Sequence, residues 1–130
     1  MKSYDVIIVG AGTTGIPAAL EASKRGLSVA LVEASGEVGG TLHLSTASIS
    51  AAGTSIQAAQ GIEDSADAHF ADYQRINHGT GHAPLVRKWM DRAADTIEWM
   101  ISLGWSAREN IAMFAPEHDL YTIPRTYRSL

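Results

Sequence analysis

The chain contains no cysteine, and this absence excludes several kinds of chemistry. Its 130 residues can form no disulfide, ligate no iron–sulfur cluster and supply no catalytic thiol. Basic residues are also few, since 10 Lys and Arg stand against 14 Asp and Glu, and no basic stretch stands out. The net charge of −4 makes nucleic acids and anionic membrane surfaces poor partner candidates.

Long apolar runs are missing as well. The first apolar run, residues 6–9, ends at Gly10, whereas a membrane span needs about 20 apolar residues and a secretory signal needs a longer apolar stretch. We therefore expect a cytoplasmic protein without a membrane partner. With 45% hydrophobic and 18% charged residues, the chain has the composition of one globular domain, residues 1–130.

Residues 4–33 follow the order strand, helix, strand. A β-branched run at residues 4–9 predicts a strand that is buried on both faces. Small apolar residues at 14–25 predict a helix that ends at Gly26, and residues 27–32 form a second apolar run. This order predicts a βαβ unit with a right-handed crossover, and hence an α/β fold of the three-layer dinucleotide-binding type.

A glycine-rich turn lies between the first strand and the helix. Residues 10–15 fit the fingerprint G-x-G-x-x-G. Gly10 permits the tight turn, Gly12 lets the backbone approach a pyrophosphate, and Gly15 lets helix and strand pack closely. The positive end of the helix stabilises phosphate charge. Glu33 lies 18 positions after Gly15, where its carboxylate would accept the ribose hydroxyls and repel the 2′-phosphate of NADP.

The rest of the chain has weaker signals. Residues 34–61 are rich in Gly, Ser, Thr and Ala without a clear period, which is typical of a loop wrapped around a ligand. Helices are predicted at about 65–77 and at 84–103, where apolar residues recur at helical spacing. Residues 105–130 form a tail with two prolines and short apolar patches.

Histidine and acidic residues outside these elements are interpreted as surface groups. His78 and His82 are four positions apart, but they flank a Gly-Thr-Gly stretch and have no third ligand nearby, so we predict a surface loop and no metal site. The run 117–119, Glu-His-Asp, is interpreted as a solvated turn, because adjacent residues rarely converge on one site.

Several short motifs follow the fingerprint in a fixed order: Val32-Glu33, Gly39-Gly40-Thr41, Ala51-Ala52-Gly53-Thr54 and Gly61-Ile62-Glu63-Asp64-Ser65. With them, residues 4 to about 104 resemble the FAD-dependent fumarate reductase and succinate dehydrogenase flavoproteins, including soluble fumarate reductases and 3-ketosteroid dehydrogenases. The resemblance implies that residues 40–42 line the diphosphate and ribityl chain and that residues 46–48 lie near the isoalloxazine ring. The predicted cofactor-binding residues are therefore Gly10, Ala11, Gly12, Thr13, Thr14, Gly15, Glu33, Ala34, Ser35, Gly40, Thr41, Leu42, Thr46, Ala47 and Ser48.

The chain departs from the family pattern at two places. Thr41 stands where membrane-bound members carry the histidine that attaches FAD covalently, so we expect non-covalent FAD. Ala47 and Ser48 stand where family members commonly have two glycines, which reduces backbone freedom. His43, two residues after Thr41, would point to the opposite side of an extended segment. A contact with the flavin or substrate and a plain role as a polar loop residue both remain open for it.

Residues 123–128 resemble a family segment that often reads Arg-Thr-His-Arg, with Tyr127 in place of the histidine. The resemblance makes Arg125 a candidate near the cofactor, but we favour its interpretation, with Arg128, as a surface pair. The arginine that serves family members as proton donor lies downstream of this chain. The catalytic residues are therefore unknown.

These features predict the FAD-binding component of an oxidoreductase that reduces or forms a C=C bond next to a carbonyl or carboxylate. Only two strong strands are visible where a doubly wound sheet needs about five, so the fold is incomplete. The chain is expected to be either a subunit of a split flavoenzyme, which we favour and which a second polypeptide would complete, or a truncated piece. Alone, the chain should expose its sheet edge and the apolar face of the helix at 84–103. The alternatives are an NAD-binding dehydrogenase domain and a non-catalytic nucleotide-binding module.

Overall fold

The computed structural model describes residues 2–45, 47–113 and 119–130. The chain divides into two compact units, Met1–Thr46 and Ala47–Leu130. Both units combine helices with paired strands, and the predicted α/β class is confirmed. Within the described ranges, every helix is too short or too polar to serve as a membrane span.

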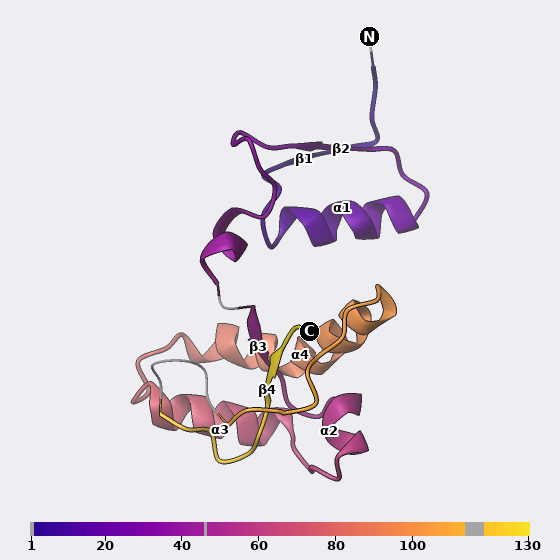
Figure 1. Ribbon diagram of the computed structural model, residues 1–130. Coiled ribbons are helices and arrows are strands. Elements are labelled where there is room, and N and C mark those ends of the chain that lie inside the picture. The colour runs from indigo at the N-terminus through magenta and orange to yellow at the C-terminus, as the bar shows by residue number, and fades with distance from the viewer. Residues whose placement is uncertain (1, 46, 114–118) are drawn as a thin grey trace. The chain divides into compact units, whose positions relative to one another are not determined.

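The first unit is built around a parallel pair of strands. Strand β1, Val6–Val9, pairs with β2, Val29–Val32, in a register that runs from Val6 opposite Val29 to Val9 opposite Val32. Helix α1, Gly15–Lys24, connects them and lies along one side of the pair (Figure 1). This is the predicted βαβ unit.

The opposite face of this strand pair is open, and here the sequence prediction was wrong. Side chains of β1 alternate between half-buried and exposed, and Ile7 and Val9 are 64% and 85% exposed. Since successive side chains of a strand point to opposite faces, α1 covers only every second residue. Among the described residues of this unit, no element covers Ile7 and Val9.

The stretch 34–61, predicted to be irregular, contains three short elements. A 3₁₀ helix, η1, spans Gly40–Leu44 in the first unit, and strand β3, Ser48–Ser50, and helix α2, Ser55–Ala59, belong to the second. A capping box starts α2: the Thr54 side chain accepts from the Gln57 N–H, while the Gln57 side chain accepts from the Thr54 N–H. Such a box satisfies two N–H groups that the first turn would otherwise leave unpaired.

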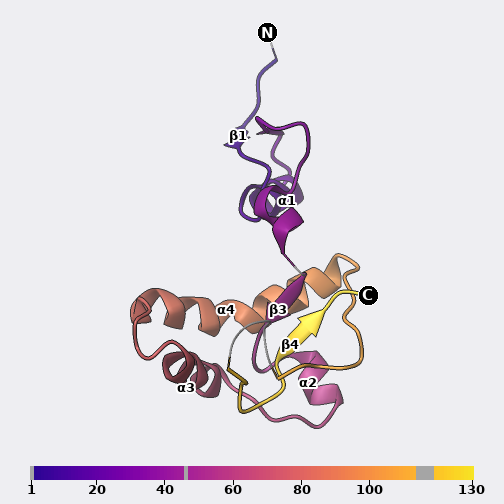
Figure 2. The same ribbon diagram turned by 60° about the vertical axis from the view of Figure 1, so that its left-hand side comes forward.

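The second unit packs two longer helices beside an antiparallel strand pair. Helix α3 spans Ala66–Ile76 and α4 spans Ala83–Ser102, and the two lie side by side (Figures 1 and 2). Strand β3 pairs with β4, Thr126–Arg128, which was not predicted in the tail. Because β3 and β4 lie far apart in the sequence, no local pattern indicates that they pair.

The apolar face of α4 is buried inside this unit, so the prediction of its exposure was wrong. Its inward residues are Val86, Met90, Ala93 and Ile97. Ala93 and Ile97 pack in one cluster with Ala51, Ile111 and Tyr127. The segment that follows α4 supplies the last two of these residues and thereby covers a helix face that the sequence left without a partner.

Candidate nucleotide-binding site

The turn from β1 to α1 depends on two glycines. Gly10 has a φ of +100°, in the region that favours glycine, and its N–H donates to the Val32 carbonyl at 2.7 Å. A Cβ on Gly15 would lie 1.7 Å from the Gly10 carbonyl oxygen and 3.4 Å from Cγ2 of Ile8. Helix and strand therefore approach so closely at this point that no side chain fits between them.

Gly12 and the start of α1 leave room for an anionic group. A Cβ on Gly12 would meet no protein atom within 4 Å, so the backbone on this side is open to a ligand. Thr14 is the N-cap residue of α1, but its side chain makes no capping hydrogen bond. An uncapped helix start offers N–H groups and a positive dipole end, which is the arrangement that binds a pyrophosphate.

Glu33, at the end of β2, is held by the turn itself. Its Oε2 accepts from the Ala11 N–H at 2.7 Å, and its Oε1 accepts from the N–H and the hydroxyl of Ser35 at 2.9 and 3.0 Å. These bonds, first the one from the Ser35 N–H and then the one from the Ala11 N–H, lower the pKa of Glu33 to about 2. The carboxylate is thus ionised and oriented at neutral pH. The sequence placed Glu33 at the ribose but did not indicate that Ala11 and Ser35 hold it.

A second glycine pair joins the fingerprint. Gly39 and Gly40 have φ values of +120° and +55°, and the Gly39 N–H donates to the Ala11 carbonyl at 2.7 Å. A Cβ on Gly40 would lie 3.5 Å from Cα of Gly12. The segment before η1 therefore lies directly on the fingerprint turn. Thr41 and Leu42 continue from there and are both exposed.

His43 does not follow the extended geometry on which its prediction depended. It lies in η1, where its Nε2 is 2.8 Å from the Val38 carbonyl oxygen. A Cβ on Gly39 would come within 2.8 Å of the same nitrogen. The ring thus packs over Gly39 and holds the end of the 35–39 loop.

The predicted cofactor-binding residues are divided between the two units. Residues 10–15, 33–35 and 40–42 belong to the first unit, where the contacts above bring them together, while Ala47 and Ser48 belong to the second. Ala47 has a φ of +55°, a conformation that glycine adopts more easily. Ala47 thus adopts a left-handed conformation at a position where the resemblance implies a glycine. Thr46 lies outside the described residues.

Arg125 is buried, so its interpretation as a surface residue was wrong. Its guanidinium forms a bidentate pair with Asp64, with Nε–Oδ2 at 2.9 Å and Nη2–Oδ1 at 3.0 Å, and its Nη1 lies 3.1 Å from Oδ2 of Asp72. Arg125 and Asp64 have fully buried side chains. Two carboxylates compensate the buried charge, and Asp72 also accepts from the N–H and hydroxyl of Thr122. Arg128, its expected surface partner, is exposed.

Tyr127, which replaces the family's histidine, is also completely buried. Its hydroxyl donates to the Ala51 carbonyl at 3.1 Å and lies 2.7 Å from Oγ1 of Thr54. Burial raises the pKa of Tyr127 to about 12, so the hydroxyl keeps its proton. Arg125 and Tyr127 therefore tie β4 to the segments on either side of α2. No local signal could have shown this, since both partners are distant in sequence.

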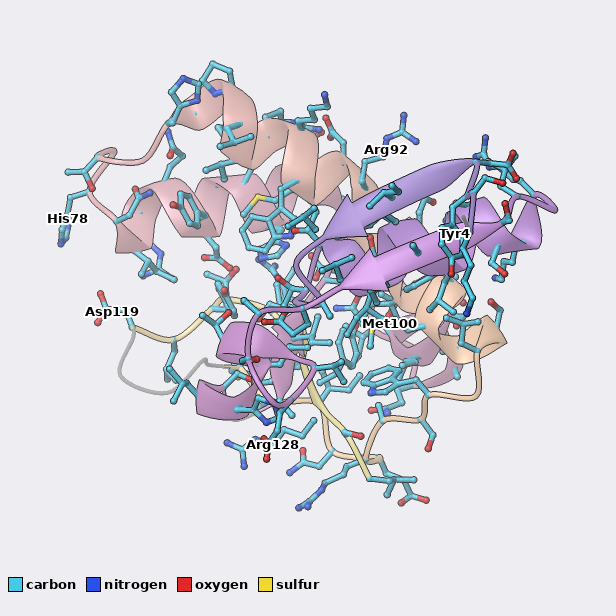
Figure 3. The ribbon with its side chains drawn as sticks, turned by 90° about the horizontal axis from the view of Figure 1, so that it is seen from above. Tyr4, His78, Arg92, Met100, Asp119 and Arg128 are labelled. Atoms are coloured by element: carbon cyan, nitrogen blue, oxygen red, sulfur yellow. The ribbon has the colours of Figure 1, made fainter. Side chains whose placement is uncertain are left out.

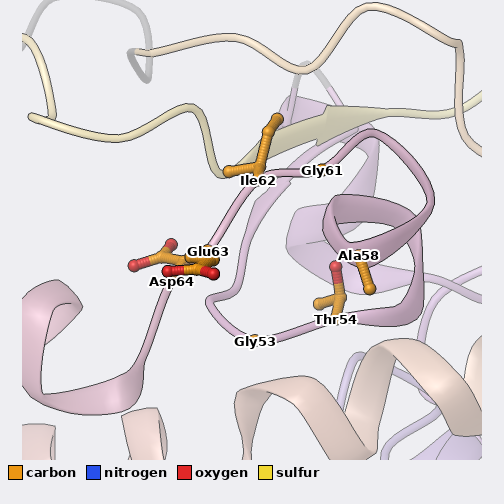
Figure 4. Close-up of a pocket in the computed structure, with 7 residues that line it drawn as sticks. All are labelled: Gly53, Thr54, Ala58, Gly61, Ile62, Glu63 and Asp64. Atoms are coloured by element: carbon orange, nitrogen blue, oxygen red, sulfur yellow. The ribbon is translucent and has the colours of Figure 1, made fainter.

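The second unit has a surface pocket of about 470 Å³ next to α2. Gly53, Thr54 and Gly61–Asp64 line it, and the carboxylates of Glu63 and Asp64 lie close together there (Figure 4). Asp64 is already paired with Arg125. None of the predicted cofactor-binding residues that the structure describes lines this pocket.

Among the residues that the structure describes, the remaining histidines and acids form no metal site. His78 and His82 are exposed, and His78 points outward from the loop after α3 (Figure 3). Over the described ranges, no three His, Asp or Glu side chains gather to hold a metal. Glu117 and His118 lie outside the described residues, and Asp119 is exposed.

Comparison with known proteins shows the family to which the chain belongs. The chain matches the family described as "FAD binding domain" over residues 5–121. It is 35% identical to NADH:fumarate oxidoreductase of Klebsiella pneumoniae over 103 residues. The aligned region is 79% of this chain and 11% of that protein. It is 34% identical to urocanate reductase of Eggerthella lenta over 116 residues. The aligned region is 89% of this chain and 19% of that protein.

A solved structure gives the same result. The open conformation of a flavocytochrome c3 fumarate reductase superposes with a TM-score of 0.81 at 29% sequence identity, covering 97% of this chain and 22% of the other. The chain therefore spans about a fifth or less of the length of these relatives.

Proposed function

The chain belongs to the FAD binding domain family, and from that premise we propose that it is the FAD-binding component of an oxidoreductase that reduces or forms a C=C bond next to a carbonyl or carboxylate. FAD is the cofactor of this family. The observation that carries the proposal is the fingerprint turn, on which Glu33 and Gly39 both form hydrogen bonds to Ala11. That arrangement places a fixed carboxylate, an open backbone and an uncapped helix start at one point.

Each part of the turn would hold one part of the cofactor. The N–H groups at the start of α1 would bind the pyrophosphate, which Gly12 lets approach, and Glu33 would accept the hydroxyls of the adenosine ribose. Gly40, Thr41 and Leu42 would follow the ribityl chain, and Ala47 and Ser48 would lie near the isoalloxazine ring. Thr41 offers a hydroxyl instead of a ring nitrogen, so FAD would be held without a covalent bond.

When bound, FAD supplies hydride transfer to or from one carbon of the C=C bond, while a protein group exchanges a proton at the other carbon. The residues of this chain bind and orient the cofactor. We assign the proton transfer to none of the residues described above. A further polypeptide would supply the group that exchanges the proton. The exposed side chains of Ile7 and Val9 support the presence of a further polypeptide, because a parallel sheet is normally covered on both faces. A cytoplasmic location stays a prediction.

The test is cofactor binding by the chain itself. The purified chain is titrated with FAD while flavin fluorescence is followed, and NAD is then added as competitor. We expect saturable FAD binding that NAD does not reverse, and complete release of the flavin when the protein is denatured. A folded chain that binds NAD and not FAD would refute the proposal, and flavin that remains attached after denaturation would refute the non-covalent mode.

A further inference from the structure

The second unit contains a cavity of about 650 Å³ that is separate from the pocket beside α2. Strand β3 lines it with residues 48–50, α3 with Tyr73 and Ile76, and α4 with Trp89. Asn77, which follows α3, and Tyr121, in the segment before β4, complete the lining. Its volume is in the range of small-molecule sites. It includes Ser48, a residue assigned above to the neighbourhood of the isoalloxazine ring, so the inference rests on the proposed function.

Aromatic rings form much of the cavity wall. The rings of Tyr73 and Trp89 meet edge to face with centroids 6.4 Å apart. Trp89 and Tyr121 both make edge contacts with His69, at 5.8 and 5.4 Å. Edge-to-face contacts are the arrangement in which a further aromatic ring is favourably bound.

The cavity lacks the charge that a small dicarboxylate requires. Every lining residue that the structure describes is uncharged at neutral pH, and serine, isoleucine, tyrosine, tryptophan and asparagine make up the set. A carboxylate buried without a cation or several hydrogen-bond donors is strongly disfavoured. The lining therefore suits the uncharged ring of a ligand and not a second carboxylate.

A buried polar atom without a partner belongs to the cavity lining. The amide nitrogen of Asn77, a lining residue, is buried and has no hydrogen-bond partner within the described part of the chain. Behind the wall, His69 packs against Trp89 and Tyr121 but does not itself line the cavity, and its two ring nitrogens are also without a partner in the described part of the chain. Burial lowers the pKa of His69 to about 4, so the ring is neutral and has one donor and one acceptor to offer. Buried polar groups are normally paired, and a polar substituent on a bound ring would pair the Asn77 amide.

We propose that this cavity binds the uncharged aromatic ring of a substrate in which the ring is conjugated to the reacting C=C bond, as in an aryl-substituted acrylate. The aromatic wall holds the ring, Asn77 meets a polar substituent on it, and the C=C bond extends past Ser48. A four-carbon dicarboxylate gains nothing from these groups.

Binding of 4-hydroxycinnamate to the FAD-loaded chain tests the proposal. It is compared by calorimetry with trans-2-hexenoate, which has the same acrylate without the ring, and with fumarate. We expect 4-hydroxycinnamate to bind at least about tenfold more tightly than either, the effect of one or two aromatic contacts. Equal affinity for 4-hydroxycinnamate and trans-2-hexenoate in a chain that holds FAD overturns the inference and leaves the proposed function intact.

Two variants locate the site. Ile76→Trp fills the cavity from its lining and should abolish the preference for the aromatic acid. Trp89→Leu, at a side chain that is 47% exposed, should weaken 4-hydroxycinnamate binding by about tenfold without unfolding the unit. Trp99→Leu is the matched control on the same helix, because Trp99 does not line the cavity.

The outcomes separate this inference from the proposed function. If Trp89→Leu and Trp99→Leu bind 4-hydroxycinnamate alike, the ring lies elsewhere and the inference is wrong. If the chain binds no FAD but still prefers 4-hydroxycinnamate, and loses that preference in Ile76→Trp, the proposed function fails while the aromatic site stands.

Discussion

Replacing Gly15 with alanine tests the fingerprint turn most directly. The new Cβ would lie 1.7 Å from the Gly10 carbonyl oxygen and 3.0 Å from its carbon. Both are backbone atoms, so no side-chain rotation relieves the clash, and the start of α1 has to move away from β1. Overpacking costs about 1–3 kcal/mol and sometimes more. Alanine regains about 0.5–1 kcal/mol of helix propensity at most. Because the clash is with rigid backbone, its cost should lie toward the upper end of that range, and the net loss of stability should be about 1–2 kcal/mol.

Two further glycines serve as controls for this experiment. A Cβ on Gly12 or on Gly36 would meet no atom within 4 Å. Gly12→Ala should therefore leave the unfolding midpoint in urea unchanged without cofactor, but weaken FAD binding, because the methyl group occupies the side on which the pyrophosphate would lie. Gly36→Ala should change neither. Gly15→Ala should lower both stability and affinity.

The pattern across the three variants, measured by urea unfolding and flavin fluorescence, decides the matter. A Gly15→Ala chain as stable as the natural one would show that helix and strand do not approach as closely as described. A Gly12→Ala chain that binds FAD normally would mean that the pyrophosphate does not lie on the open backbone, and the assignment of the fingerprint would have to be given up.

Three further predictions concern ionisable groups. Glu33→Gln should weaken FAD binding by roughly tenfold, because the amide cannot form the charge-assisted hydrogen bonds of the carboxylate. In the natural chain, FAD affinity should not change between pH 5 and 8 on account of Glu33, since its pKa of about 2 keeps it ionised throughout. A step in affinity within that interval would contradict the assignment of Glu33. Arg125→Met should destabilise the chain by about 3–5 kcal/mol in urea unfolding because it leaves Asp64 buried and uncompensated, whereas the exposed Arg92→Met should have no effect; equal stabilities would show that the pair is not buried. His69 has a folded pKa of about 4, below its usual 6.5, so the unfolded chain binds more protons between these values; the stability that this provides is fully present above about pH 6.5 and falls toward pH 4. His69→Leu should flatten this part of the stability profile, and an unchanged profile would show that another group titrates.

The first unit could be predicted from the sequence because its contacts are local. Strand, turn, helix and strand follow one another within residues 4–33, and the fingerprint glycines act on their immediate neighbours. Glu33 reaches Ala11 only because β2 pairs in register with β1. That register follows from the βαβ connection, so the position of the carboxylate was predictable although its hydrogen-bond partners were not.

The second unit could not be predicted in the same way because long-range pairs determine it. Ser48 lies opposite Arg128 in the β3–β4 pair. No periodicity in either segment indicates that it pairs with a segment so distant along the chain. Arg125 looks like a surface residue in a tail until Asp64 and Asp72 are known to surround it. Helix periodicity correctly marked the buried face of α4, but it could not show that the segment after the helix covers that face.

The buried polar network gives a reason for this long-range order. A charge such as that of Arg125 is costly to bury and brings little net stability even when it is paired, so apolar residues would serve a plain core equally well. What the network provides is position. The bidentate pair with Asp64 and the bond from Tyr127 to Ala51 allow one placement of β4, and the ladder from β4 then sets the register of β3. Because residues 48–50 line the aromatic cavity, side chains that never touch a ligand determine where its wall lies. Arg125→Lys should therefore weaken 4-hydroxycinnamate binding in the same calorimetric titration, because it loosens the pair that fixes β4 and, through the ladder, the strand that lines the cavity.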